Sequence, residues 1–489
     1  MTDAVTPSRP SLVWFRDDLR TGDNPALAAA IAASRCTAAV YILETAPETL
    51  RKPGGAALWK LHGALEALAI DLAALNVPLI LMRGDARRVV PDCMADVGAD
   101  RVFWNRRYSP AAVAVDSAVK SDLRDRGAEV HSFNASLLIE PFAAKTKDGG
   151  YYKVFSPFCR AARAMDCDLA PLRAPKPAAS WPKPPTFGET LEEWELLPTK
   201  PDWAGGLRAT WAHGERAAKQ RLSAFLDDGF GGYRDGRDIP DSAHVSMLSP
   251  HLRFGEIGPR QVRAAAAAAA ERAGGARDKD FEAFERELYW RDFSHNLLFH
   301  ADDLATKNFQ EKFDAFPWRT DAKALQAWRR GRTGYPIVDA GMRQLWETGW
   351  MHNRVRMVVA SFLTKHLVID WREGEAWFWD TLVDADHASN PANWQWVAGS
   401  GADAAPYFRI FNPMTQGEKF DPDGAYVRRW VPELKDLPKK YVHAPWTAPD
   451  DMLKNAGIRL GETYPEPIVD HKTARERALA AFAETKTDD

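Results

Sequence analysis

Cysteine is scarce in this chain, and the spacing of the few cysteines excludes two kinds of site. Only four occur among 489 residues, at Cys36, Cys93, Cys159 and Cys167. They form no C-x-x-C pair, and no histidine lies beside them at metal-ligand spacing. We therefore expect reduced thiols, with neither a disulfide framework nor a zinc site.

Long apolar runs are also missing. No uninterrupted apolar stretch reaches the roughly 18 residues that a membrane helix needs. The N-terminal segment, MTDAVTPSRP, lacks the charged start and the apolar core of a signal peptide. These absences predict a soluble, cytoplasmic protein with no membrane partner.

An excess of positive charge is absent too, whereas tryptophan is abundant. The net charge is -3, and domains that bind nucleic acid usually carry a basic excess, so any contact with DNA must depend on local positive charge. The chain holds 19 tryptophans, which crowd between Trp318 and Trp396. Most of them must be core residues, but the crowding requires a second explanation.

The first third of the chain alternates short apolar runs with amphipathic stretches. We expect strands at 11–15, 38–43, 78–82, 101–104 and 128–133, and helices at 24–33, 56–75 and 86–97. This alternation predicts a parallel sheet covered by helices on both faces. The segment after the first strand reads WFRDDLRTGDNPAL, which is not a dinucleotide-binding fingerprint, and an α/β fold alone names no function.

The composition shifts to Pro, Lys, Ala and Trp between Asp168 and Trp203, which favours a long connection over regular structure. After it, helical periodicity recurs at 217–227, 258–272, 280–300, 323–330, 337–348, 354–367 and 373–384. We therefore predict an α/β domain over 1–135, a connection over 136–205 and an all-helical domain over 206–489.

Two segments of the second half combine a structural pattern with ligand-binding residue types. SMLSPHLR, from Ser246 to Arg253, is a helix start whose hydroxyls and backbone N–H groups suit an anion, although such a start is more often a plain cap. In RELYWRDF, Glu287, Trp290 and Arg291 share one helical face. That face is either structural or able to hydrogen-bond and stack on a flipped base.

Two further segments are dense in polar and aromatic residues. Asn353, Arg356 and Met357 share a helical face with Arg354 close by, and the arginines suit a carboxylate, a cofactor phosphate or a DNA phosphate. The segment 382–413 is polar and irregular in its first half, as functional loops often are. Its Asp384, Asp386 and Asn390 fail the calcium-loop spacing, so no metal is expected, and GSGADA at 399–404 receives no dinucleotide role.

Four long motifs occur in the same order as in the DNA photolyase/cryptochrome family, which this chain resembles from Trp14 to Trp430. The motifs are LVWFRDDLRTGDNPAL, TGYPIVDAGMRQLWETGWMHNRVRM, DWREGEAWFWDTLVDADHASNPANWQW and AGSGADAAPYFRIFNPMTQGEKFDPDGAYVRRW. The resemblance implies a Rossmann-like α/β domain followed by an all-helical domain that binds FAD in a bent conformation.

The resemblance also implies which residues contact FAD. Ser246, Leu248 and Ser249 would hold the pyrophosphate, and Asn390 would face flavin N5. The other implied cofactor residues are Tyr233, Arg237, Trp290, Asn353, Arg356, Asp384 and Asp386. Asparagine at position 390 favours a photolyase, because plant cryptochromes usually carry aspartate there and animal cryptochromes carry cysteine.

The implied activity is light-driven repair of cyclobutane pyrimidine dimers by electron transfer from reduced FAD to a flipped-out dimer. Glu287 would hydrogen-bond the dimer, Asn390 would act beside the flavin, and Trp290, Asn353, Met357 and Trp396 would line the lesion pocket. Arg237, Arg354, Arg409 and Lys419 would contact the DNA. A (6-4) photoproduct enzyme is the alternative lesion class, but such enzymes typically carry a histidine pair where only His352 is present.

The tryptophan crowding receives its second explanation from the same resemblance. Trp394, Trp371 and Trp318 match the family's electron-transfer chain from the flavin to the surface. Trp346, Trp350, Trp377 and Trp379 form either a branch of that chain or part of the core, and the core is favoured.

Three further expectations concern cofactor, assembly and alternative function. A second antenna chromophore is implied, with methenyltetrahydrofolate favoured over deazaflavin, although Ala111 and Ala112 replace an Asn-Glu pair found in many folate-using relatives. We expect a monomer whose partner is DNA containing pyrimidine dimers. The alternative function is a cryptochrome-like blue-light photoreceptor, against which Asn390 and Glu287 stand.

Overall fold

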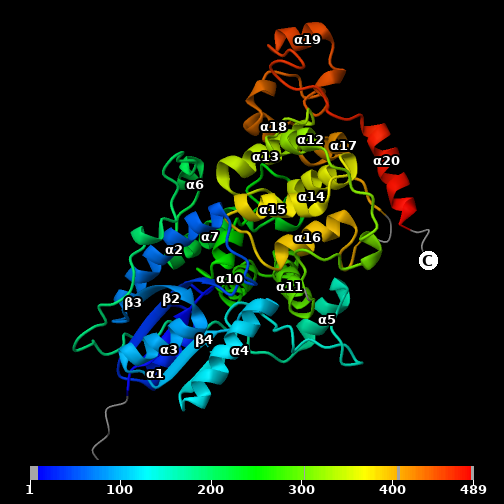
Figure 1. Cartoon of the computed structure of the whole chain (residues 1–489). Helices are drawn as coiled ribbons and strands as arrows, with labels where there is room; N and C mark the ends of the chain where they lie inside the picture. The colour runs from blue at the N-terminus through cyan, green and yellow to red at the C-terminus, as the bar shows by residue number, and fades with distance from the viewer. Residues whose placement is uncertain (1–8, 302, 405–407, 486–489) are drawn as a thin grey trace, which may run out of the picture. The chain divides into compact units, whose positions relative to one another are not determined.

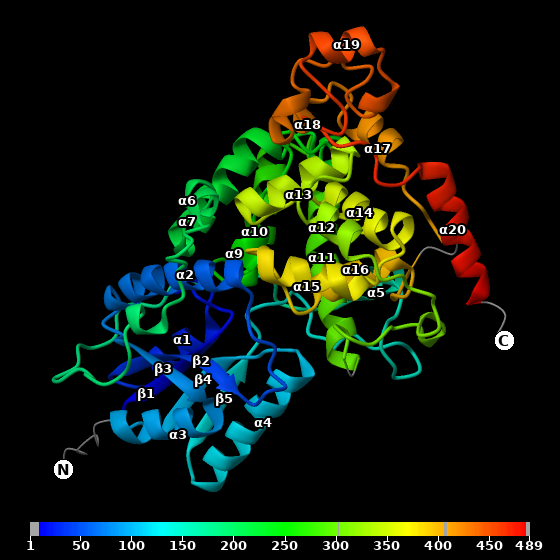
Figure 2. The same cartoon turned by 45° about the horizontal axis from the view of Figure 1, so that its top comes forward.

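The computed structural model describes residues 9–301, 303–404 and 408–485. The chain forms two compact units, shown within the cartoons of Figures 1 and 2. Unit 1 comprises residues 1–204, 211–227 and 246–302, and unit 2 comprises residues 205–210, 228–245 and 303–489. The domain boundaries predicted at 135 and 205 remain predictions.

Unit 1 contains a five-stranded parallel sheet in the order β3-β2-β1-β4-β5. Its strands are β1 (Ser11–Phe15), β2 (Thr37–Ala46), β3 (Leu79–Asp85), β4 (Arg101–Asn105) and β5 (Glu129–Phe133). All five predicted strands are confirmed, with ends that differ by a few residues. The strand order reverses direction between β1 and β4, and such a switch point opens a crevice at the carboxyl edge of a parallel sheet.

Side chains of β1 alternate between two cores, because successive residues of a strand face opposite sides. Leu12 and Trp14 pack with residues of α3 and α4, whereas Val13 and Phe15 pack with residues of α1 and α2. All four side chains are fully buried. The sheet is therefore covered on both faces, as Figure 2 shows, and the predicted α/β fold is confirmed.

The helices of unit 1 cover the sheet and extend beyond it. They are α1 (Pro25–Ala33), α2 (Gly55–Ala73), α3 (Ala86–Val97), α4 (Pro110–Asp125), α5 (Phe155–Ala164), η1 (Glu192–Trp194), α7 (Gly214–Ala224), α9 (Ser249–Arg253), α10 (Pro259–Arg272) and α11 (Asp278–His300). Local sequence sets several boundaries: Asn24 caps α1 by accepting the Leu27 N–H at 3.1 Å, with Pro25 following. The short η2 (Phe225–Gly229) runs from unit 1 into unit 2.

The described part of unit 2 is helical. Its elements are α6 (Gly205–Thr210), α8 (Tyr233–Gly236), η3 (Glu311–Phe313), α12 (Ala322–Arg329), α13 (Pro336–Thr348), α14 (Asn353–Ser361), η4 (Phe362–His366), α15 (Trp371–Thr381), α16 (Ser389–Ala398), α17 (Pro413–Phe420), α18 (Ala425–Trp430), η5 (Pro432–Leu434), η6 (Pro445–Thr447), α19 (Asp450–Asn455) and α20 (His471–Glu484). The predicted helical second half is thus confirmed. No helix in the described ranges is long and apolar enough to cross a membrane.

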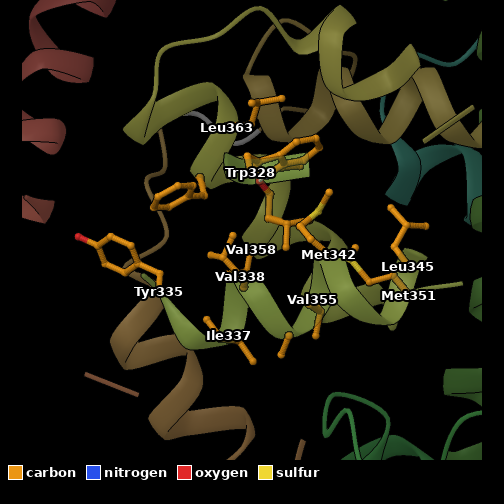
Figure 3. Packing of buried hydrophobic residues seen from close by; sticks show 14 of the residues in the cluster. Trp328, Tyr335, Ile337, Val338, Met342, Leu345, Met351, Val355, Val358 and Leu363 are labelled. Atoms are coloured by element: carbon orange, nitrogen blue, oxygen red, sulfur yellow. Dashed lines mark hydrogen bonds between the residues drawn. The ribbon is translucent and has the colours of Figure 1, made fainter. Parts of the chain in front are cut away.

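The core of unit 2 is built around α13 and α14. Figure 3 shows Val338 and Met342 of α13 beside Val358 of α14, with Trp328 next to them. The two helices approach closely at Gly341, where an added Cβ would lie 2.4 Å from a methyl group of Val355. A side chain at position 341 would therefore separate the two helices.

One expectation about the core is wrong. Trp350 and Trp379 are buried, but the side chain of Trp346 is 58% exposed and lies parallel to the ring of Trp377, with centroids 5.9 Å apart. The prediction that Trp346 belongs to the core assumed that a large aromatic ring is buried. Trp346 is exposed because it lies on the outer side of α13, although its ring is hydrophobic.

Candidate functional site

His352 joins two of the predicted site residues in unit 2. Its Nδ1 accepts the Arg354 N–H at 3.1 Å and so caps α14, while Nε2 donates to the carbonyl of Arg237 at 3.0 Å. Burial lowers the pKa of His352 to about 4, which keeps the ring neutral and lets Nδ1 accept. The ring thereby fixes Arg237 relative to Asn353, the first residue of α14. From the sequence, His352 was interpreted only as a marker of the lesion class, and its capping role was not predicted.

Arg356 and Asp384 form an ion pair. Two guanidinium nitrogens donate to the two carboxylate oxygens at 3.2 and 2.8 Å, and Nε donates to the carbonyl of Met351 at 2.7 Å. The Asp384 carboxylate is almost wholly buried, whereas Arg356 keeps a quarter of its side chain exposed. Both residues were predicted, and the structure brings them together.

Asp386 and Asn390 shape the start of α16. One Asp386 oxygen accepts the N–H groups of Ala388 and Ser389 at 3.0 and 2.6 Å. The side-chain amide of Asn390 donates to the carbonyl oxygen and the carboxylate of Glu375 at 3.1 and 2.8 Å. The nitrogen of Asn390 is therefore committed to Glu375, which fixes the direction of its Oδ1. Glu375 was not predicted, since it lies within a helix whose pattern indicated only packing.

Arg237 and Arg354, two more of the predicted site residues, have different neighbours. The Arg237 guanidinium lies 5.5 Å from the ring of Tyr233, which is buried. Arg354 pairs with Asp238 at 2.7 Å and lies 4.4 Å from the ring of Phe420. Its charge is therefore already compensated within unit 2.

Trp396 and Arg409 line one pocket of about 180 Å³ in unit 2. The Trp396 indole donates to the carbonyl of Asp403 at 3.0 Å, and the exposed Arg409 lies over the ring of Phe411. Lys365 also lines this pocket, with its Nζ 2.6 Å from the carbonyl of Ala398. Residues 405–407 of the fourth sequence motif lie outside the described residues. Lys419, on α17, is exposed.

The three tryptophans of the predicted electron chain have different surroundings. Trp394 is buried on α16 and contacts the rings of Phe378 and Trp328 at centroid distances of 5.0 and 6.1 Å. Trp371 is fully buried at the start of α15, and its indole donates to Asn308 at 2.9 Å. Trp318 is partly buried beside Phe316, at 4.3 Å. Its exposure suits the surface end of such a chain.

In unit 1, the segment Ser246–Ser249 leads into α9. Met247 has a left-handed backbone, with φ of 51°, and Leu248 occupies the N-cap of α9. Serine was expected just before a helix whose first residue is Pro250, but Ser249 is itself the first helical residue, and Leu248 at the N-cap offers no side-chain cap. Leu248 is buried, and because its side chain is apolar, only its backbone can serve as a polar contact.

A buried charged cluster, which was not predicted from the sequence, lies around Glu256, shortly after this segment. The carboxylate of Glu256 pairs with Lys60 at 2.8 Å and with His251, and it accepts the Gly214 N–H at 2.7 Å. The pair Lys60 and Glu256 is wholly buried. Burial raises the pKa of Glu256, but the hydrogen bond with His251 and the charge of Lys60 outweigh burial and lower the pKa to about 2. The cluster therefore ties His251, on α9, to Lys60 of α2 and to the start of α7.

Glu287 and Trp290 lie one helical turn apart on α11 in unit 1, and both are half-buried. Arg291, on the same face, donates to the carbonyl of Ser136 and so has a structural partner. The ring of Phe155, on α5, lies against the indole of Trp290. Of the three residues predicted to share this helical face, Arg291 therefore uses its guanidinium group in a hydrogen bond within the protein.

A second cluster occupies the carboxyl edge of the sheet at the β1/β4 switch point. Arg16 pairs with Asp116 at 3.1 Å, and Arg107 pairs with Asp116 and Glu44. Two nitrogens of the buried Arg16 have no partner among the described residues. Within the same ranges, no group of three or more His, Cys, Asp or Glu is placed to hold a metal ion.

Comparisons with known proteins agree with this geometry. A family model described as DNA photolyase matches residues 11–180, and one described as FAD binding domain of DNA photolyase matches residues 284–484. The deoxyribodipyrimidine photo-lyase of Agrobacterium fabrum is 54% identical over 480 residues, which are 98% of each chain. The chain belongs to the DNA photolyase family.

Other relatives place the chain within this family. The crystal structure of a bacterial class III photolyase from Agrobacterium tumefaciens superposes with a TM-score of 0.94 at 53% identity and covers 99% of this chain and 100% of that one. Cryptochrome-1 of Arabidopsis thaliana is 38% identical over 97% of this chain and 70% of its own. That cryptochrome is more distant than the Agrobacterium photolyase, and the predicted family is confirmed.

Proposed function

We propose that this protein is a deoxyribodipyrimidine photo-lyase that splits cyclobutane pyrimidine dimers in DNA with FAD and light. The observation that carries this proposal is the full-length identity of 54% to a photo-lyase of that name. The anchored polar groups of α14 to α16 support it, because they present fixed donors and acceptors as a dinucleotide cofactor requires.

The residues present fit FAD by their chemistry. The guanidinium groups of Arg237 and Arg356 suit phosphates, and the Asp384 and Asp386 carboxylates suit ribose hydroxyl groups or ring N–H groups. The buried amide of Asn390 has its nitrogen bound to Glu375, which leaves Oδ1 as the acceptor. When bound in reduced form, FAD supplies the light-driven electron.

The proposed cofactor contacts follow the family match residue by residue. In unit 1, Ser246, Leu248 and Ser249 bind the pyrophosphate, and Trp290 contacts the cofactor. In unit 2, the residues that would contact it are Tyr233, Arg237, Asn353, Arg356, Asp384 and Asp386, and Asn390 would face flavin N5. His352 and Glu375 orient Asn353 and Asn390.

The lesion contacts are proposed separately for each unit. In unit 1, Glu287 hydrogen-bonds the dimer and Trp290 lies against it. In unit 2, Asn353, Met357 and Trp396 contact the lesion, and Arg237, Arg409 and Lys419 contact phosphates. Arg354 contributes less to DNA binding, since Asp238 compensates its charge.

Further proposals concern electron supply, antenna and assembly. Trp394, Trp371 and Trp318 would carry electrons toward an oxidised cofactor. A methenyltetrahydrofolate antenna, preferred to deazaflavin, would be recognised by the absorption band of the purified protein. We further propose a monomer, which size-exclusion chromatography with light scattering tests, and a cytoplasmic location, which cell fractionation tests.

The deciding experiment is repair of a thymine dimer in a short oligonucleotide by the reduced protein, in blue light and in the dark. We expect light-dependent repair that Glu287→Ala abolishes and that high salt weakens. Glu282→Ala is the matched control, because Glu282 is exposed on the same helix. Flavin binding without any repair would refute the proposal and favour a photoreceptor.

A further inference from the structure

One face of the Trp290 indole is covered by the ring of Phe155, the first residue of α5. The two ring centroids are 3.6 Å apart, and the ring planes differ by 6°. Isolated aromatic pairs prefer offset or edge-to-face arrangements over such a face-to-face contact. The packing of α5 on α11 therefore imposes the contact.

The surrounding rings hold both partners in place. Phe155 is 1% exposed, and Phe293 lies edge-on to Phe155 and to Trp290, with centroids 5.8 Å apart in both pairs. Phe158, one turn further along α5, packs on Phe293 at 5.5 Å. The indole of Trp290 is thus restrained on one face and at one edge, while Trp290 as a whole stays half-buried.

We propose that Phe155 is a positioning residue for the DNA lesion: it fixes the plane of Trp290 so that the opposite indole face stacks on a base of the flipped-out dimer. This inference depends on the proposed function. Phe155 does not itself contact the lesion, because its ring is buried beneath the indole. It acts only through Trp290.

The physical effect is preorganisation. A base that stacks on an aromatic side chain contributes binding energy whatever its identity, because every base has a flat face. An indole that is free to rotate must be ordered on binding, and this ordering weakens the complex. Removal of the flat ring of Phe155 should therefore weaken binding of dimer-containing DNA by about tenfold, within the range of a single stacking contact.

The test compares Phe155→Leu with Phe158→Leu in the flavin-loaded protein. Both changes remove a buried ring of α5, but only the first removes the face that covers Trp290. We expect Phe155→Leu to weaken binding of a dimer-containing oligonucleotide by about tenfold relative to Phe158→Leu. Binding of undamaged DNA should be equal in the two variants. Phe155→Tyr, which keeps a flat ring, should bind the dimer as the wild type does.

Three outcomes would overturn the inference: equal dimer affinity of Phe155→Leu and Phe158→Leu, failure of Phe155→Tyr to bind the dimer, or a full further loss when Phe155→Leu is added to Trp290→Leu. If Phe155→Leu does not fold, Phe155→Met replaces it, because methionine fills the space without a flat face. Wild-type protein that binds flavin but repairs no dimer would instead refute the proposed function, so the two failures are distinguishable.

Discussion

Gly374, on α15, is the position where a single methyl group should impair the proposed electron chain. A Cβ added to Gly374 would lie 2.1 Å from Cη2 and 2.4 Å from Cζ3 of Trp394, and 2.7 Å from a methyl group of Leu363. Carbon atoms in contact are about 3.5 Å apart, so the indole of Trp394 must retreat by about 1 Å or more. Its neighbours Phe378 and Trp328 restrict that movement.

The energetic cost of Gly374→Ala can be bounded from this geometry. Overpacking of a filled core costs about 1–3 kcal/mol. Replacement of glycine by alanine inside a helix returns about 0.5–1 kcal/mol. The net destabilisation should therefore be at most about 2.5 kcal/mol, which leaves the protein folded while it shifts Trp394.

Two assays separate electron supply from repair. Light-driven reduction of the oxidised flavin, followed by absorbance with an external electron donor, should be slower in Gly374→Ala. Repair by the chemically reduced protein should be unchanged, because that reaction bypasses the tryptophans. The control is Gly205→Ala in α6, where an added Cβ meets nothing within 4 Å. Equal photoreduction by the two variants would refute either the clash or the role of Trp394.

Three further predictions concern buried polar groups. Burial lowers the pKa of His352 in the folded protein to about 4 from 6.5, so the unfolded chain binds the proton first as the pH falls. The free energy of unfolding should therefore fall by up to about 3 kcal/mol between pH 6.5 and pH 4. In His352→Asn, urea denaturation should show a smaller dependence on pH over this range. Glu256→Gln leaves the wholly buried Lys60 unpaired and should cost about 3–5 kcal/mol, and a urea midpoint within error of the wild type would contradict this. Asp384→Asn weakens two charged hydrogen bonds to Arg356, so we expect a loss of about 2 kcal/mol in denaturation of the flavin-free protein, whereas an unchanged midpoint would show that the pair contributes nothing.

The sheet could be predicted because its signals are local. Each strand of unit 1 is a short apolar run, and β1 is buried on both faces, so it reads as a continuous run without polar interruptions. The helix α16 was harder to predict from the sequence. Its sequence, SNPANWQWVA, begins with polar residues, and its start depends on the capping carboxylate of Asp386, so the segment resembled an irregular loop.

Partners far apart in the sequence could not be predicted at all. Arg354 and Asp238 are separated by 116 residues, and Lys60 and Glu256 by 196 residues. Periodicity shows that two residues share a helical face, but it does not show which other element covers that face. The pairing of Arg354 with Asp238 therefore changes a residue predicted to contact DNA into one with an internal partner, and only the fold reveals it.

The anchoring of Asn390 explains in physical terms why an amide suits this position. Its nitrogen donates to both the carbonyl oxygen and the carboxylate of Glu375, at 3.1 and 2.8 Å. An aspartate at position 390 would place a carboxylate oxygen against the carbonyl oxygen and the carboxylate of Glu375, all of which accept hydrogen bonds. A proton would have to be taken up there to avoid repulsion between the two buried carboxylates. An asparagine amide does not titrate, so its nitrogen donates to Glu375 without proton uptake and its Oδ1 remains an acceptor. The two hydrogen bonds to Glu375 therefore fix the orientation of the group proposed to meet the flavin.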